Sequence, residues 1–207
     1  TDTVAKSYSD YPSSKFFGKK SGIIQNYTED IFVGYRYFET FEAAKERVLY
    51  PFGYGLSYTD FEIESKSFTD EKNTVRICVN VKNKGEKYSG KEVVMAFSST
   101  ASEKYCAPKY ELRAFKKTKL LSPGENEEIE LTFDTDDMAL FDDTGKFGAK
   151  NSWILPPGNY KIYIGNNVEN LALTGVIRNE HDTVLSTVTE IKTELSERLT
   201  SVGKTEK

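Results

Sequence analysis

Three stretches of the sequence alternate between apolar and polar residues, and this pattern limits the folds open to the chain. Residues 74–83 read TVRICVNVKN, with an aliphatic side chain at every second position. Residues 126–134 (NEEIELTFD) and 159–165 (NYKIYIG) repeat the same alternation. Because successive side chains of a β-strand point to opposite faces, a period of two predicts strands that are buried on one face and solvated on the other.

Further short segments have the composition of strands and are separated by turn-forming residues. The other strand candidates are residues 59–65, 92–98, 112–118 and 170–177. The turn signals are Asn83-Lys84-Gly85, Ser122-Pro123-Gly124 and Pro156-Pro157-Gly158. About seven short strands separated by such turns are typical of an antiparallel two-sheet β-sandwich of the immunoglobulin type. We therefore predict an all-β fold.

Composition and charge exclude several classes of partner. The 207 residues include 29% charged and 38% hydrophobic residues, an ordinary balance for a globular protein. The formal net charge is −4 and no basic stripe is present, so we expect no nucleic-acid partner. No segment approaches the ~20 apolar residues of a spanning helix, so we expect no membrane partner. The first residue is Thr1 and no signal peptide follows, from which we expect a soluble piece of a longer protein.

The N-terminal quarter of the chain is rich in aromatic residues. Residues 1–57 hold 13 of the 27 aromatic residues but show little sustained periodicity, and we expect them to be mostly irregular. Aromatic side chains without a self-contained pattern indicate a surface that packs on something else. That surface could be the following sandwich, which we place at residues 58–178, or another part of a larger protein.

The tail, residues 179–207, shows a different pattern. Apolar residues recur at spacings of four, three, four and four, which is one stripe of an amphipathic helix. We therefore predict a short helix over about residues 184–199. The stripe consists of Val184, Val188, Ile191, Leu195 and Leu199.

Residues that could bind a metal or form a disulfide are few. His181 is the single histidine, which excludes a multi-histidine metal site. Cys78 and Cys106 are too few for a disulfide framework; they could form one bridge, although we favour two thiols. The run from Asp134 to Asp137 lacks the later glycine and glutamate of a calcium loop. We assign no metal and no cofactor site.

Acidic and aromatic side chains also have simpler roles than catalysis. Neighbouring carboxylates at Asp134 with Asp136-Asp137, and at Asp142-Asp143, fit turns and caps better than an acid/base pair, because adjacent residues of a strand face opposite sides. Trp153 is interpreted as a core residue or an inter-domain anchor rather than a sugar platform. No catalytic residue is assigned, and substrate-binding residues stay unknown.

A series of motifs follows along the chain in a specific order. Residues 26–38 read NYTEDIFVGYRYF, and residues 50–58 read YPFGYGLSY. Downstream are GKEVV at 90–94, ELRAFKK at 111–117, LSPGE at 121–125, MALFDDTG at 138–145 and the run from Trp153 to Gly165. Together, over roughly residues 22–180, these motifs resemble the C-terminal part of glycoside hydrolase family 3, where YPFGYGLSY matches the junction that leads into a fibronectin type III-like domain.

The resemblance implies a role in a β-glucosidase-like enzyme that hydrolyses O-glycosyl bonds. Retaining glycosidases need two carboxyl groups about 5 Å apart. In the family, the nucleophile is an Asp within Ser-Asp-Trp of a barrel domain, and the acid/base is a Glu upstream of the segment seen here. This sequence contains no Asp-Trp dipeptide. We therefore expect a non-catalytic portion that braces the parent enzyme's barrel and second domain, with carbohydrate at a loop rim as a further partner; the alternative is an independent carbohydrate- or protein-binding module.

Overall fold

The structure is a computed structural model that describes residues 29–100, 106–189, 198–199 and 205–206. These residues fall into two compact units. The sandwich unit consists of Phe52–Ala101 and Glu111–Thr189. The helical unit takes its described residues from 29–51, from 106–110 and from the two short stretches near the C-terminus. The sandwich unit begins at Phe52, six residues before the start that we expected from the sequence.

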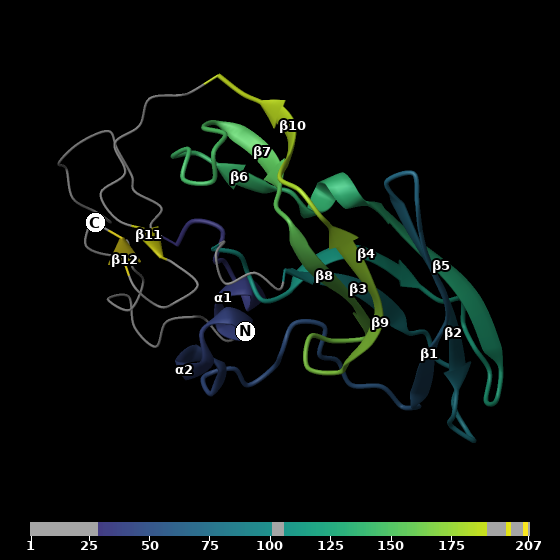
Figure 1. Ribbon diagram of the computed structural model, residues 1–207. Helices are drawn as coiled ribbons and strands as arrows, with labels where there is room; N and C mark the ends of the chain where they lie inside the picture. The colour runs from purple at the N-terminus through teal and green to yellow at the C-terminus, as the bar shows by residue number, and fades with distance from the viewer. Residues whose placement is uncertain (1–28, 101–105, 190–197, 200–204, 207) are drawn as a thin grey trace. The chain divides into compact units, whose positions relative to one another are not determined.

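Strands are the main secondary structure of the described chain (Figure 1). The elements follow in the order α1 (Tyr35–Thr40), α2 (Glu42–Lys45), β1 (Phe61–Glu71), β2 (Thr74–Asn83), β3 (Val93–Thr100), β4 (Glu111–Lys117), β5 (Asn126–Asp134), a 3-10 helix (Thr135–Met138), β6 (Leu140–Asp142), β7 (Ser152–Leu155), β8 (Gly158–Gly165), β9 (Leu171–Asn179), β10 (Thr183–Thr187), β11 (Arg198–Leu199) and β12 (Thr205–Glu206). The predicted all-β, antiparallel class is confirmed.

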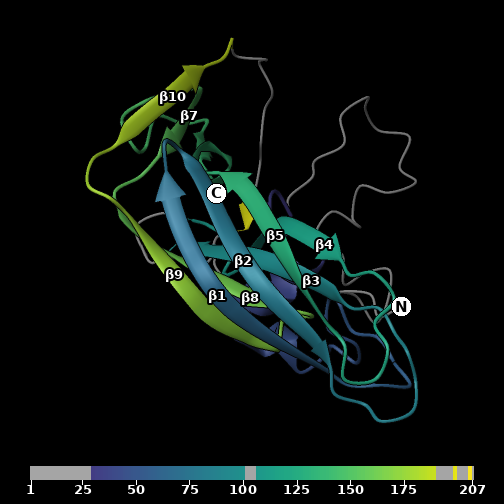
Figure 2. The same ribbon diagram turned by 90° about the vertical axis from the view of Figure 1, so that its right-hand side faces the viewer.

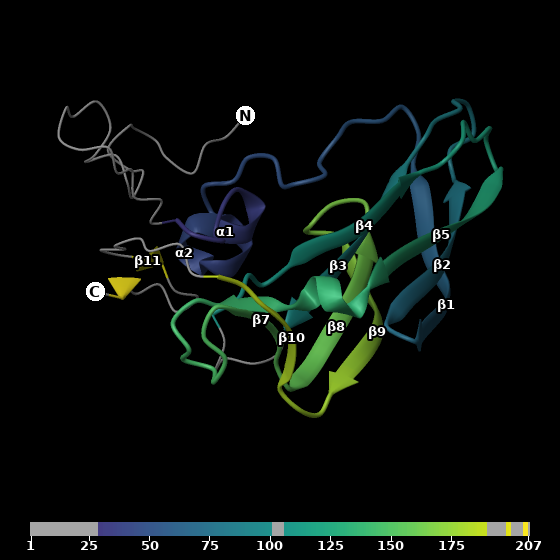
Figure 3. The same cartoon turned by 90° about the horizontal axis from the view of Figure 1, so that it is seen from above.

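Two sheets of the sandwich unit face each other over one hydrophobic core. One sheet has the order β1-β2-β5 and the other the order β4-β3-β8-β9, and all neighbours are antiparallel. Figure 2 shows β1, β2 and β5 as one layer in front of the second sheet, and Figure 3 shows the same layers from above. A smaller sheet, β10-β7-β6, continues from the ends of β8 and β9.

The inward face of each central strand is buried, as the alternating pattern predicted. All four alternating aliphatic residues of β2 have 0% exposure. The partners that complete the core come from β3, β5, β8 and β9: Val94, Ala96, Ile129, Leu131, Phe133, Tyr160, Ile162, Ile164 and Ile177. Since each such side chain contributes roughly 1.5–3 kcal/mol when fully buried, this core accounts for the stability of the unit.

The predicted helix over residues 184–199 is wrong where the structure describes it. Residues 183–187 form β10, which pairs antiparallel with β7, so that Thr183 lies opposite Leu155 and Thr187 opposite Ser152. The segment reads TVLST, and β-branched Thr and Val favour an extended backbone. The free edge of β7 also offers unpaired N–H and C=O groups. Residues 190–197 of the predicted helix lie outside the described residues, and 198–199 form β11.

Two short helices interrupt the irregular course expected for the N-terminal segment. The rings of Phe32 and Phe41 are 5.2 Å apart and edge-on, and Tyr37 lies 4.9 Å from Phe41. Glu39 on α1 is buried and forms an ion pair with Lys45 on α2 at 3.4 Å. Aromatic packing and this ion pair hold the α1–α2 turn. No helix among the described residues is long and apolar enough to cross a bilayer.

Candidate docking face and exposed aromatic pair

The start of the sandwich unit is fixed to the outer face of β3. The N–H of Val168 donates to the carbonyl oxygen of Phe52 at 3.0 Å, and the Phe52 ring lies edge-on to Phe97 at 6.4 Å. Gly53 has φ +89°, and a Cβ at this position would lie 2.5 Å from Met95 Cε and 2.6 Å from the carbonyl oxygen of Asn166. Only glycine fits both this backbone conformation and this close approach.

The outer face of the four-stranded sheet carries a row of apolar side chains, beside the exposed Lys161. Strand register places Leu112, Phe97, Tyr163 and Leu173 in one row across it, because directly paired residues share a face. Phe115, paired with the outward-facing Met95, is 69% exposed, and Leu173 is 56% exposed. Val176 lies on β9 with Leu173 and is also exposed, whereas Phe115 lies on β4, at the opposite edge of the sheet. We call the exposed side chains Phe115, Leu173 and Val176 the docking face.

The outer face of the three-stranded sheet is charged instead. Arg76 on β2 pairs with Glu130 on β5 at 3.3 Å, and Lys66 pairs with Glu64 on β1 at 2.7 Å. Solvated ion pairs of this kind contribute little to stability, but they keep a sheet face in water. The two outer faces therefore differ in chemistry, and only the four-stranded sheet presents apolar side chains to a partner.

A second apolar surface follows Gly53 along the connector. Leu56 and Tyr58 are each 91% exposed, and the Tyr58 ring lies 5.8 Å from that of Tyr88. Asn83, which is fully buried, holds the segment that carries Tyr88, because its Nδ2 donates to the carbonyl oxygens of Tyr88 and Leu121 at 2.9 Å each. The sequence signal for this surface was the aromatic density of the YPFGYGLSY motif.

Trp153 is not a core residue, which corrects one of the two interpretations drawn from the sequence. It lies on β7 directly opposite Phe141 on β6, with ring centroids 5.3 Å apart and an interplanar angle of 55°. Trp153 is 44% exposed and Phe141 41% exposed. We call these two residues the aromatic pair.

The β6–β7 connection beside the aromatic pair is held by one buried carboxylate. Asp142 Oδ1 accepts a hydrogen bond from the N–H of Gly145 at 2.9 Å, and Oδ2 accepts from the N–H groups of Phe147 at 2.9 Å and Ala149 at 3.3 Å. Asp142 thus has the turn role that the sequence suggested, and its oxygens are occupied by backbone donors. The last residue of β6 therefore holds the loop closed.

Other acidic and sulfur-containing residues also have structural surroundings. Asp134 and Asp137 form a reciprocal capping box at the 3-10 helix, in line with the predicted cap role. Cys78 and Cys106 are both half-buried and belong to different units. Within the described ranges, no group of three or more His, Cys, Asp or Glu side chains is arranged to hold a metal ion.

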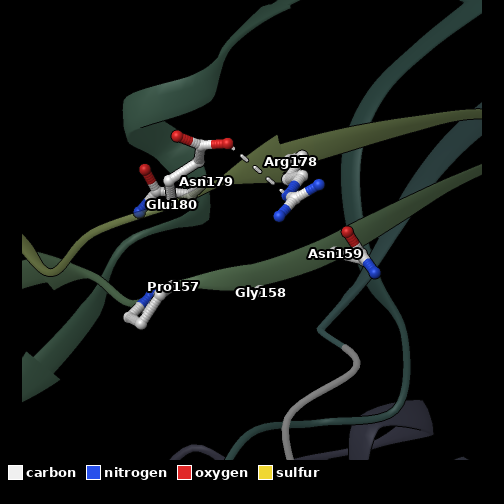
Figure 4. A pocket seen from close by; sticks show the side chains of 6 residues that line it. All are labelled: Pro157, Gly158, Asn159, Arg178, Asn179 and Glu180. Atoms are coloured by element: carbon white, nitrogen blue, oxygen red, sulfur yellow. Dashed lines mark ion pairs between the residues drawn. The ribbon is translucent and has the colours of Figure 1, made fainter.

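One open pocket of about 560 Å³ lies where β8 begins and β9 ends (Figure 4). It is lined by Pro157, Gly158, Asn159, Arg178, Asn179 and Glu180. Three of its polar side chains already have partners, because Asn179 Nδ2 donates to the carbonyl oxygens of Leu155 and Pro156 and Arg178 pairs with Glu180 at 3.8 Å. The lining contains no pair of carboxyl groups, so the pocket is not a glycosidase site.

Comparison with known proteins identifies the domain. A family model described as a fibronectin type III-like domain matches residues 92–168. The chain is 40% identical over 188 residues to β-glucosidase A of Butyrivibrio fibrisolvens, covering 84% of this chain and 22% of that protein. It is 42% identical over 167 residues to a β-glucosidase of Ruminococcus albus, covering 81% of this chain and 17% of that protein.

Solved structures give the same result. A β-glucosidase from Paenibacillus barengoltzii superposes with a TM-score of 0.86 at 36% identity, over 96% of this chain and 22% of that one. β-Glucosidase 3B from Thermotoga neapolitana in complex with glucose superposes with a TM-score of 0.70 at 36% identity, over 86% and 24% of the two chains. The chain therefore spans about a fifth of the length of these relatives. It belongs to glycoside hydrolase family 3, as a part that contains the fibronectin type III-like domain.

Proposed function

We propose that this chain is the non-catalytic portion of a family 3 glycosidase of the β-glucosidase type, and that it braces the catalytic domains of the parent enzyme. The observation that supports the proposal most is the contrast between the two outer faces of the sandwich. A self-sufficient domain has no need of an apolar outer face, whereas a domain buried against a neighbour does. The exposed connector residues Leu56 and Tyr58 extend the apolar area available for contact.

The chemistry of hydrolysis is assigned to the remainder of the parent enzyme. In the described residues, the carboxylates of Asp134, Asp137 and Asp142 are held in caps and turns. A retaining mechanism needs a nucleophile and an acid/base that converge on one glycosidic bond. We therefore expect no aryl-glycoside cleavage by this chain alone.

Reconstitution tests the bracing role. A family 3 β-glucosidase that lacks the region matched here would be supplied with this chain in trans, and its aryl-glucoside cleavage and melting temperature measured. We expect the wild-type chain to restore activity and the double variant Phe115→Ser/Leu173→Ser to lose most of that rescue. The matched control Arg76→Ser/Glu130→Ser changes two residues of the charged outer face and should rescue as well as wild type.

Two outcomes would contradict the proposal. One is equal rescue by the wild-type and Phe115→Ser/Leu173→Ser chains while both remain folded by circular dichroism. The other is glycoside cleavage by the isolated chain that co-purifies with it through every step. An independent binding module, the alternative drawn from the sequence, would instead bind its ligand in isolation and give no rescue.

A further inference from the structure

The connection between β3 and β4 is longer than an antiparallel hairpin requires. The two strands are directly paired as far as Ser98 and Glu111, and residues 101–110 join the end of β3 to the start of β4. Hairpin connections usually need only about two to five residues. Residues 106–110 of this connection group with the helical unit, whereas both strands belong to the sandwich unit. We call residues 106–110 the strap.

The base of the strap is fixed by a largely buried arginine. Arg113 on β4 donates from Nε to the hydroxyl oxygen of Ser98 and from Nη2 to Glu111 Oε2, at 2.7 Å each. The side chains of Arg113 and Glu111 are only 12% and 15% exposed. Because Ser98 and Glu111 are the last directly paired residues of β3 and β4, these hydrogen bonds hold both ends of the connection in place.

The strap itself is held by Thr40, the last residue of α1. The N–H of Lys109 donates to Thr40 Oγ1 at 2.9 Å, and the same hydroxyl group donates to the carbonyl oxygen of Arg36 at 2.6 Å. The hydroxyl group therefore links the last turn of α1 to the backbone of the strap. Pro108, next to Lys109, is buried, and its ring fixes the backbone angle φ, which limits the conformations open to the strap.

The α1–α2 turn has few stabilising features of its own. α1 has six residues and α2 has four, whereas isolated helices shorter than about 12–15 residues are marginal in water. Among the residues that the structure describes, no side chain forms a hydrogen bond at the N-cap of either helix. The first turn of α1 contains no acidic residue and its last turn no basic residue, so the helix dipole lacks the charges that usually stabilise it. The turn therefore depends on tertiary contacts, and the strap supplies one at the end of α1.

We propose that the strap transmits the order of the β3–β4 hairpin to the α1–α2 turn, so that the turn loosens when the base of the strap loosens. The hydrogen bond from Lys109 stabilises α1 only while the strap is held in place, because a mobile strap must lose conformational entropy to reach Thr40. The coupling goes beyond the bracing role, since it acts within this chain and uses none of the residues of the docking face. A disturbance of the hairpin end would reach the segment before the sandwich unit by this route.

A double-mutant cycle on the full chain tests the coupling, with amide hydrogen exchange at Phe41 and Ala44 as the readout. The N–H groups of these two residues form hydrogen bonds within the turn, at 3.0 and 2.8 Å. Thr40→Val removes the hydroxyl group and should accelerate their exchange about three- to tenfold, the effect of about one hydrogen bond. Arg113→Met loosens the base of the strap and should act in the same direction. The double variant Thr40→Val/Arg113→Met should exchange no faster than Thr40→Val, because the strap is already released.

Two matched controls separate the strap from other effects of the substitutions. Thr40→Ser keeps the hydroxyl group and should keep the slow exchange of wild type. Arg76→Met removes an arginine from the charged outer face of the other sheet and should leave both reporter amides unchanged. If Thr40→Ser exchanges as fast as Thr40→Val, or if Arg76→Met has the effect of Arg113→Met, the strap is not the cause and the proposal is overturned.

Exchange at Val79 on the central strand β2 shows whether the sandwich stays intact in each variant. If Arg113→Met accelerates it, Ser98→Ala takes the place of Arg113→Met, since it removes only the acceptor of Arg113 Nε. The proposal is also overturned if Thr40→Val exchanges like wild type, if a loosened base leaves the reporter amides unchanged, or if the two effects multiply in the double variant. Rescue in trans does not enter this measurement, so the strap and the bracing role can fail independently.

Discussion

The backbone N–H of Val168 donates a 3.0 Å hydrogen bond to the carbonyl oxygen of Phe52, although the two residues are far apart in sequence. Val168 follows β8, and Phe52 opens the sandwich unit. The bond fixes the connector on the outer face of the four-stranded sheet before the chain enters β1. The direction in which the YPFGYGLSY segment leaves the sandwich is thus set by the sandwich itself.

Gly53 is the position in this connector that should tolerate change least. In Gly53→Ala, the new Cβ would overlap Met95 and the backbone at Asn166, and the residue would keep an unfavourable φ of +89°. We expect a loss of ~3 kcal/mol in the free energy of unfolding, measured by urea denaturation. Gly55→Ala is the control, since nothing lies within 4 Å of its added Cβ. Equal stability of the two variants would show that the connector is not fixed as described.

Asn83 should be intolerant of a change that keeps its shape. Its Nδ2 donates to two carbonyl oxygens, and its Oδ1 accepts from Gly85 N–H at 2.9 Å and from the Thr59 hydroxyl. Asn83→Asp would place a carboxylate oxygen against both carbonyls in a fully buried site. We expect a cost of roughly 3 kcal/mol or more in the free energy of unfolding.

The control for Asn83→Asp lies three residues earlier on the same strand. Asn80 accepts a hydrogen bond from Asn126 Nδ2 at 2.8 Å on the solvated face, and an Asp at that position can still accept. Asn80→Asp should therefore change the melting temperature little. A similar loss in both variants would mean that charge, rather than the buried hydrogen bonds, sets the effect.

Asp142 should control the loop beside the aromatic pair. Asp142→Ala leaves three backbone N–H groups without their acceptor, and we expect a loss of about 2 kcal/mol or more. The sharper readout is local: hydrogen exchange at Gly145, Phe147 and Ala149 should accelerate while β2 amides stay protected. The exposed Asp70→Ala variant serves as the control and should leave exchange at all three unchanged.

The pH dependence of Glu125 follows from its position in the turn before β5. The hydrogen bond from Lys119, at 2.9 Å, lowers the pKa of the Glu125 carboxyl below its ordinary value of 4.5, and the Ser122 N–H adds to this effect. A group whose folded pKa is lowered contributes stability above its unfolded pKa and loses it as pH falls through the folded pKa. The contribution of Glu125 is therefore present at neutral pH and lost below about pH 4.5.

Carboxyl titration by NMR checks this directly. Lys119→Met should raise the pKa of Glu125 toward 4.5, although the bond from Ser122 keeps part of the shift. High salt should have the same effect, because the pair is solvent-exposed. Lys116→Met, on the neighbouring strand, should leave the titration unaltered. An unchanged Glu125 pKa in Lys119→Met would contradict the assigned cause.

The long strands were predictable because the alternation of apolar and polar residues is enough to identify them. Residues 74–83 and 126–134 were expected as strands and are β2 and β5 with the same bounds, since each keeps strict alternation from end to end. β6 and β7 were missed because three and four residues are too few to show a period. β10 was missed because Val184 also fits a helical stripe with Val188. The free edge of β7, which favours the strand instead, is not visible in local sequence.

The exposed surfaces were only partly predictable. The aromatic density of the connector indicated a contact surface. The motif ELRAFKK does not show that Phe115 faces outward, because the β3–β4 pairing shifts its register between Ala96 and Phe97, and this shift changes which residues of β4 share a face. The aromatic pair joins Phe141 to Trp153, and their contact depends on which residues meet across β6 and β7. Contacts of this kind come from register, and register is set by the whole sheet.

The stretch between β3 and β4 has a consequence for how this domain can be inherited. Lys109 N–H donates to Thr40 Oγ1 at 2.9 Å, and residues 106–110 group with the helical unit although the strands on either side belong to the sandwich unit. A single recombination point near residue 52 would therefore transfer the sandwich unit together with residues 106–110, but without Thr40, to which Lys109 is bonded. To keep this contact, an exchange of the sandwich unit between enzymes must include the segment that contains Thr40. The evolutionary history of the sandwich unit is then tied to that of the segment before it.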